Sequence, residues 1–191
     1  MRKFFIFLTI ITCVLSSSVF AMTPTYTNDA KFSRSVGNCC YYVDSAASGY
    51  TNQINDAAYN WENTGYGWNP IYMTAVSSNY ATHIDFYAAT PATNVYLNSS
   101  VAAFTSFWNS NSAVIVTPPN APSYNYFYTE IMFNTSNTGS YDYRTSKHEM
   151  GHALGLNHYA NHYSIMYPSL DGMYVTTVQQ CDHDTINYLY N

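Results

Sequence analysis

The chain has 191 residues and a formal net charge of −5, and only 9% of its residues are charged. Its six Lys and Arg residues are too few for a phosphate-binding surface, which excludes nucleic acid as a partner. The length suits a single domain with a full hydrophobic core. Tyrosine occurs 21 times, and we expect many of these side chains to be half-buried with the phenol tip in water. An adhesive or sugar-binding face rich in tyrosine is the alternative.

Residues 1–21 have the pattern of a secretory signal peptide. Two basic residues precede an apolar run from Phe4 to Leu15, and Val19-Phe20-Ala21 fits a cleavage site that follows Ala21. The apolar run is too short to span a bilayer comfortably, and no later stretch qualifies. We therefore expect a protein that is secreted, to the extracellular space or the periplasm, and that has no membrane span once the signal peptide is removed.

After cleavage the chain would retain three cysteines, Cys39, Cys40 and Cys181. An odd number in an exported protein implies either one disulfide with a leftover thiol or an intermolecular bond. We expect Cys39 or Cys40 to pair with Cys181, which would tie the first strand to the last helix.

Residues 22–38 are polar and lack periodicity, which predicts an N-terminal extension or a short pro-segment in front of one domain at residues 39–191. Within that domain, residues 52–63 have the apolar spacing of an amphipathic helix. Strands are predicted at 40–44, 71–76, 82–88 and 126–133. The β-branched run Ala113–Thr117, stopped by two prolines, indicates an edge strand, and residues 91–111 fit either a short helix or an aromatic loop.

Two residues of the strand at 82–88, His83 and Asp85, share its polar side. A second metal site is one interpretation of this pair, and ordinary hydrogen bonding is the more common one.

The most informative stretch, HEMGHALGLNH, begins at His148. His148 and His152 are four residues apart, so on a helix they lie on one face and can share a metal ion. Gly155 can adopt the left-handed backbone that ends the helix and turns the chain, so that His158 supplies a third imidazole. Three imidazoles with an open fourth position suit catalytic zinc, and Glu149 stands where a general base would be. We therefore predict one catalytic Zn²⁺.

This stretch resembles the HExxHxxGxxH signature of the metzincin metalloendopeptidases, and SIMYP, with Met166 at its centre, resembles the Met-turn of the matrixin branch. The resemblance implies an α+β, zincin-like fold with a twisted mixed sheet of about five strands. It also implies an antiparallel edge strand, the zinc-site helix beneath the sheet and a C-terminal helix. Met166 would form an apolar floor under the imidazoles.

The resemblance further implies where a substrate would bind. The edge strand would pair with the substrate backbone, and the segment after the Met-turn would form the wall of the specificity pocket. The residues expected in these roles are Ala113, Val114, Ile115, Val116, Pro168 and Leu170. Few acidic clusters are present, so the structural calcium that is common in the family has no support in this sequence.

Two aspartates outside the motif have an open role. Matrixins are often kept latent, and Asp29 could cover the metal until cleavage near Arg34, or it could simply be solvated in a tail. Asp182 resembles a carboxylate that anchors the processed N-terminus in matrixins, or it simply favours the positive start of a helix.

Local capping signals place the ends of two helices. Thr145 or Ser146 is expected to cap the zinc-site helix, and Thr177 with Gln180 fits a capping box that opens the last helix. The two remaining histidines, His162 and His183, lie outside the motif spacing and are expected on the surface.

The function predicted from these features is that of a secreted, monomeric zinc endopeptidase that hydrolyses peptide bonds in proteins. One alternative is an exported zinc-containing binding protein with an inactive protease fold, and another is a zinc hydrolase that acts on substrates other than peptides. Glu149 argues against the first alternative, because a site that only binds a ligand does not need a base beside the metal.

Overall fold

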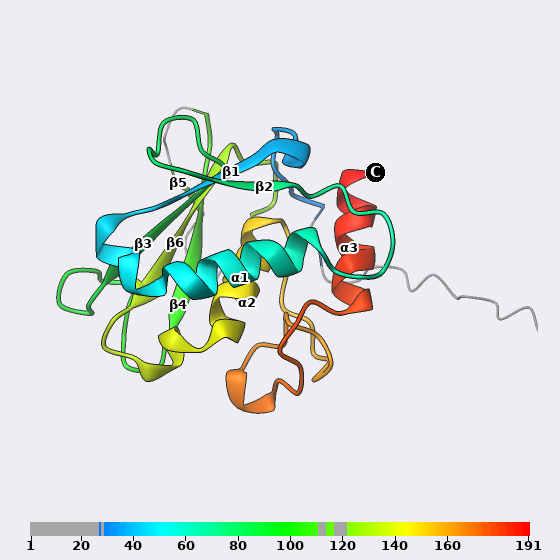
Figure 1. Ribbon diagram of the computed structural model, residues 1–191. Coiled ribbons are helices and arrows are strands. Elements are labelled where there is room, and N and C mark those ends of the chain that lie inside the picture. The colour runs from blue at the N-terminus through cyan, green and yellow to red at the C-terminus, as the bar shows by residue number, and fades with distance from the viewer. Residues whose placement is uncertain (1–26, 28, 111–113, 117–121) are drawn as a thin grey trace, which may run out of the picture.

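A six-stranded mixed sheet forms the centre of the computed structural model, which describes residue 27 and residues 29–110, 114–116 and 122–191, without the side chains of 114–116 (Figure 1). The strands are β1 (Cys39–Val43), β2 (Met73–Val76), β3 (Ile84–Ala89), β4 (Ala103–Trp108), β5 (Val114–Val116) and β6 (Tyr128–Asn134), in the spatial order β2-β1-β3-β6-β4-β5. The first three and β6 are parallel, whereas β4 is antiparallel to both β6 and β5. The predicted α+β class, the mixed sheet and the antiparallel edge strand are confirmed.

Three α-helices accompany the sheet: α1 (Thr51–Glu62), α2 (Tyr143–Ala153) and α3 (Gln180–Tyr190). Figure 1 shows α1 and α2 side by side below the sheet and α3 beyond one end of it. Short 3-10 helices lie at Val36–Asn38, Ser45–Tyr50, Thr138–Tyr141 and Leu170–Gly172. The zinc-site helix and the C-terminal helix are therefore both present, as predicted.

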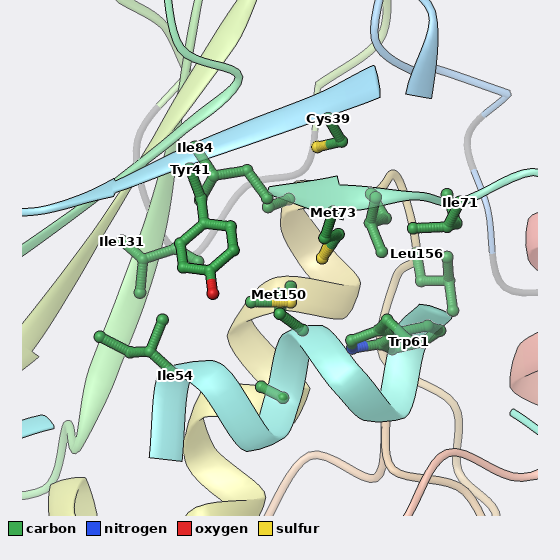
Figure 2. Close-up of a cluster of buried hydrophobic side chains, with 14 of the residues drawn as sticks. Cys39, Tyr41, Ile54, Trp61, Ile71, Met73, Ile84, Ile131, Met150 and Leu156 are labelled. Carbon is green, nitrogen blue, oxygen red and sulfur yellow. The ribbon is translucent and has the colours of Figure 1, made fainter. Parts of the chain in front are cut away.

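The main core lies between the sheet and the two helices below it. Figure 2 shows Ile54 and Trp61 of α1, Met150 of α2 and Ile84 and Ile131 of the sheet in one cluster, and all five are fully buried. Burial of such side chains stabilises a fold by about 1.5–3 kcal/mol each. The Trp61 indole also donates a hydrogen bond to a main-chain carbonyl of α2, so this core fixes the position of the zinc-site helix.

Strand β4 is the element that the sequence did not predict. Residues 91–111 suggested a short helix or an aromatic loop, but Ala103–Trp108 pairs along its whole length with β6. The four central residues, Phe104–Phe107, are all buried, because both faces of the strand are covered. A strand with two buried faces shows no alternation of polar and apolar residues. This is why the sequence predicted about five strands, whereas the sheet has six.

The ends of two helices also differ from the prediction. Asp142, and neither Thr145 nor Ser146, caps α2 by accepting the N–H of Arg144 at 2.8 Å. At α3 the capping box is formed by Gln179 and Asp182. Because Ser146 does not form a capping box, the Glu149 carboxylate stays available to the site.

The described part of the N-terminal segment is packed against the domain. Thr27 forms an antiparallel bridge with Leu156, and Phe32 forms a parallel bridge with Tyr126. The Phe32 ring is 3% exposed and packs edge-on to Tyr126, with ring centroids 4.8 Å apart. Lys31 donates a hydrogen bond from Nζ to the Leu189 carbonyl of α3. Residues before 39 thus contribute to the core, and cleavage near Arg34 would remove part of it.

The expected disulfide is not formed, since neither Cys39 nor Cys40 is bonded to Cys181. Cys39 is fully buried in β1, where it pairs with Met73 of β2. Cys181 lies in the first turn of α3, and its Sγ atom is 4.0 Å from the Tyr163 carbonyl oxygen.

We expect Phe32→Ala to lower the free energy of unfolding by about 3–4 kcal/mol, because it removes a buried ring from the core. The matched control is Tyr80→Ala, which truncates an aromatic side chain that is 89% exposed and should change the stability little. Urea unfolding of both variants provides the measurement. Equal stability of the two variants would show that the N-terminal segment is not part of the core.

Candidate metal centre

Three imidazoles converge on one point below the sheet. His148 and His152 project from one face of α2, and His158 follows the turn that ends this helix. The Nε2 atom of His148 lies 3.0 Å from Nε2 of His152 and 3.2 Å from Nε2 of His158. A tetrahedral zinc site with Zn–N distances of about 2.0–2.1 Å separates its nitrogens by about 3.3 Å. The three rings therefore fit one zinc ion.

Main-chain carbonyls set the tautomer of two of these rings. Nδ1 of His148 lies 2.8 Å from the Ile165 carbonyl, and Nδ1 of His152 lies 2.7 Å from the Leu156 carbonyl. A carbonyl oxygen only accepts, so Nδ1 carries the hydrogen in both rings and Nε2 presents a lone pair. The close Nε2 atoms thus face each other as acceptors, which is the arrangement that a shared cation satisfies.

All three rings favour the neutral form that binds a metal. Burial, with a smaller effect of neighbouring His158, lowers the pKa of His148 to about 4. Burial and the two other imidazoles lower the pKa of His152 well below its ordinary value, and burial lowers the pKa of His158. At neutral pH the trio is therefore ready to bind a cation without losing protons first.

Two glycines of the motif allow other segments to reach the histidines. Gly155 has a φ of +102°, and a Cβ here would lie 2.6 Å from the Ala30 carbonyl oxygen, so the predicted left-handed turn before His158 is confirmed. A Cβ on Gly151 would lie 2.3 Å from Sδ of Met166. Glycine at 151 therefore lets Met166, which is fully buried, pack directly against α2 next to the histidines.

Asp182 fixes the Met-turn from the side of α3. Its carboxylate is fully buried and accepts hydrogen bonds from Ser164 Oγ at 2.5 Å, from the Ile165 N–H at 3.2 Å and from the Gln179 N–H at 2.8 Å. The same Ile165 supplies the carbonyl that orients His148. Asp182 therefore starts α3 and also holds the loop that orients the first metal ligand.

The carboxyl group of Glu149 is held by a residue that the sequence did not single out. Thr105 of β4 lies with Oγ1 2.8 Å from Oε2 and 3.1 Å from the main-chain oxygen of Glu149. Burial raises the pKa of Glu149 to about 7, and the hydrogen bond from Thr105 opposes this rise. Thr105 was missed because its strand was not predicted. Glu149 is thus a carboxyl group that can gain and lose a proton near neutral pH.

The trio and Glu149 open into a cleft of about 640 Å³. Its lining includes Ser100–Thr105 together with Pro168 and Leu170, two residues that the sequence suggested for substrate binding. Val114–Val116 forms strand β5, which pairs with Phe107 and Trp108 at the far end of β4. The side chains of Val114, Ile115 and Val116, and the whole of Ala113, lie outside the described residues.

The other polar candidates have structural partners. His83 is buried, with Nδ1 accepting the Cys40 N–H at 3.2 Å and Nε2 3.1 Å from the Ser35 carbonyl, which agrees with ordinary hydrogen bonding. His183 is 2% exposed and lies 2.8 Å from the Thr64 hydroxyl, so the expectation of a surface residue was wrong.

The carboxylate of Asp29 is not among the metal-ligating groups that lie together at the histidine trio. Its carboxylate faces Tyr188 of α3, where a hydrogen bond raises the pKa of the phenol. The interpretation of Asp29 as a cover of the metal is therefore not supported by its position.

Three neutral imidazoles on an HExxHxxGxxH segment, a Met-turn beside them and a carboxyl group at the same cleft define a metzincin type of metal centre. The sequence profile of the matrixin family, peptidase family M10, matches residues 52–191. The chain therefore belongs to the matrixins, a family of zinc metallopeptidases. No curated protein matches the chain in a sequence search. In the described parts of the chain, no helix has the length and apolar character needed to cross a membrane.

We expect the wild-type protein to bind one zinc ion per chain, and His158→Ala to lower the zinc affinity by at least about 100-fold, because only two imidazoles remain. His162→Ala, which removes a histidine outside the trio, should bind zinc like the wild type. Competition with a coloured chelator measures both affinities. Unchanged affinity of His158→Ala would contradict the assignment of the three ligands.

Proposed function

We propose that this matrixin is a secreted, monomeric zinc endopeptidase that hydrolyses internal peptide bonds of protein substrates. The observation that carries the proposal is the position of Glu149, which is buried beside the histidine trio, held by Thr105 and open to the cleft. Export is supported by the signal-peptide pattern of residues 1–21, which lie outside the described residues.

In the proposed reaction, Glu149 acts as the general base and then as the general acid. Thr105 engages Oε2, which leaves Oε1 to accept a proton from the attacking water and to return it to the departing amine. A pKa of about 7 suits both transfers, because the carboxyl group is neither a very weak base nor a very weak acid near neutral pH. Zinc, when bound by the three histidines, would polarise the scissile carbonyl and lower the pKa of a water ligand toward about 7.

The substrate backbone would lie along one side of the cleft. Ala102–Thr105 lines the cleft and belongs largely to β4, so this strand is a candidate for backbone pairing with a substrate. The part of the cleft lined by Pro168 and Leu170 would receive a substrate side chain. A peptide bound along β4 would lie next to Thr105, the residue of this strand that holds Glu149.

We expect the zinc-loaded chain without its signal peptide to cleave peptides in a mixed library, and a chelator to stop the cleavage. Glu149→Gln should lower kcat/KM by about 10³-fold while zinc stays bound, because the proton acceptor is lost and no ligand is removed. Mass spectrometry of the products and metal analysis give the two readouts.

The matched control for that experiment is Glu130→Gln. Burial, together with Asp85, raises the pKa of Glu130 to about 7 as well, but this residue lies on β6 outside the cleft. Its substitution should leave the activity unchanged. A wild type as inert as Glu149→Gln would favour a binding protein with an inactive protease fold. Cleavage of esters or simple amides without cleavage of peptides would favour a different hydrolase.

We further expect Thr105→Val to reduce kcat about tenfold with little change in KM, and Thr105→Ser to restore it. Because the hydrogen bond from Thr105 lowers the pKa of Glu149, its loss should raise this pKa and move the acidic limb of the pH profile to higher pH. Steady-state kinetics across pH 5–9 would measure both effects. An unshifted profile in Thr105→Val would contradict the proposed role of the hydroxyl group.

A further inference from the structure

The segment Tyr167–Met173, here called the cleft wall, lines the cleft with all of its residues except Gly172. Its only regular structure among the described residues is the short 3-10 helix Leu170–Gly172. A segment with so little internal hydrogen bonding depends on neighbouring elements for its conformation.

Arg144, in the first turn of the zinc-site helix, is hydrogen-bonded to the cleft wall. Its Nη1 atom donates hydrogen bonds to the Leu170 carbonyl at 3.0 Å and to the Met173 carbonyl at 3.1 Å. These carbonyls belong to the first residue of the 3-10 helix and to the residue that follows the helix, so one guanidinium group binds both of its ends. Hydrogen bonds from a charged donor are about twice as strong as neutral ones.

The guanidinium group is itself held in place by the residue that caps the helix. Asp142 accepts hydrogen bonds from Nε of Arg144 at 3.0 Å and from Nη2 at 2.6 Å, and it also accepts the Arg144 N–H. This two-pronged geometry orients the plane of the guanidinium group and aims Nη1 at the wall. Asp142 is the cap of α2, the helix that carries two of the metal ligands. This cap is thereby coupled to the shape of the cleft.

A second contact, from His162, holds the C-terminal part of the wall. Nδ1 of His162 lies 2.5 Å from the Gly172 carbonyl, and the imidazole is stacked between Tyr167 and Tyr174, with ring centroids 4.2 and 4.8 Å away. Three carbonyls of the wall, at 170, 172 and 173, are therefore bound by side chains from outside the wall. The conformation of the wall is imposed by these contacts.

We propose that Arg144 is a specificity-determining positioning residue, which sets the side chains accepted next to the scissile bond by fixing the cleft wall. Arg144 does not line the cleft, so it acts on the substrate only through the wall. The inference rests on the proposed peptidase function and adds to it a residue that selects among substrates. It predicts that loss of the guanidinium group weakens the discrimination between substrate side chains and leaves the metal centre intact.

The test compares Arg144→Met with Arg34→Met in the zinc-loaded chain without its signal peptide. Arg34 is a matched control, because its guanidinium group also donates to two main-chain carbonyls, those of Ala81 and Thr82, but away from the cleft. Hydrogen exchange of the amides of residues 169–174 should become about tenfold faster in Arg144→Met and stay unchanged in Arg34→Met. Arg144→Lys keeps the charge without the two-pronged geometry and should give an intermediate rate.

Selection is measured in two ways on the same variants. In peptide-library digestion, the ratio of kcat/KM between preferred and disfavoured side chains should fall about tenfold in Arg144→Met, mainly through KM. Peptide hydroxamates, which chelate the metal and differ in one side chain, should show the same loss of discrimination in their affinities.

These readouts separate the two hypotheses. A wild type that discriminates among hydroxamates but cleaves nothing would contradict the peptidase function, and a loss of that discrimination in Arg144→Met would still support the role of Arg144. Unchanged hydrogen exchange of the wall, or a loosened wall with unchanged discrimination, would overturn the proposal. Equal zinc content of all variants confirms that the effect does not come from the metal ligands.

Discussion

The metal centre depends on two hydrogen bonds between histidine rings and main-chain carbonyls. The Ile165 carbonyl fixes the ring of His148 and the Leu156 carbonyl fixes that of His152, so the lone pairs on Nε2 point to one place. Each carbonyl comes from a loop that follows α2. The correct folding of these two loops is therefore as important to the site as the spacing of the histidines on the helix.

Much of the remaining structure holds those loops. The left-handed turn at Gly155 brings Leu156 and His158 back to the end of α2, and the missing side chain at Gly151 makes room for Met166. Asp182 binds the Met-turn to α3 through a buried carboxylate, which is stable there because each partner is a hydrogen-bond donor. The C-terminal helix thus contributes to the metal centre without lining it.

The metal-binding chemistry could be predicted from the sequence, because His148, His152 and Gly155 act through local helix and turn geometry that depends only on spacing. Long-range contacts could not be predicted in this way. Thr105 reaches Glu149 from a strand whose two buried faces leave no alternating pattern. The Arg144 contacts depend on the packing of distant loops, which one sequence does not reveal.

The account depends on a single metal ion bound by three imidazoles and no sulfur. X-ray absorption spectroscopy of the zinc-loaded protein tests this directly, because it counts and identifies the atoms around the metal. We predict three histidine nitrogens and one oxygen at about 2.0–2.1 Å. A sulfur ligand at about 2.3 Å, from any of the cysteines, or fewer than three imidazoles, would contradict the metal centre described above.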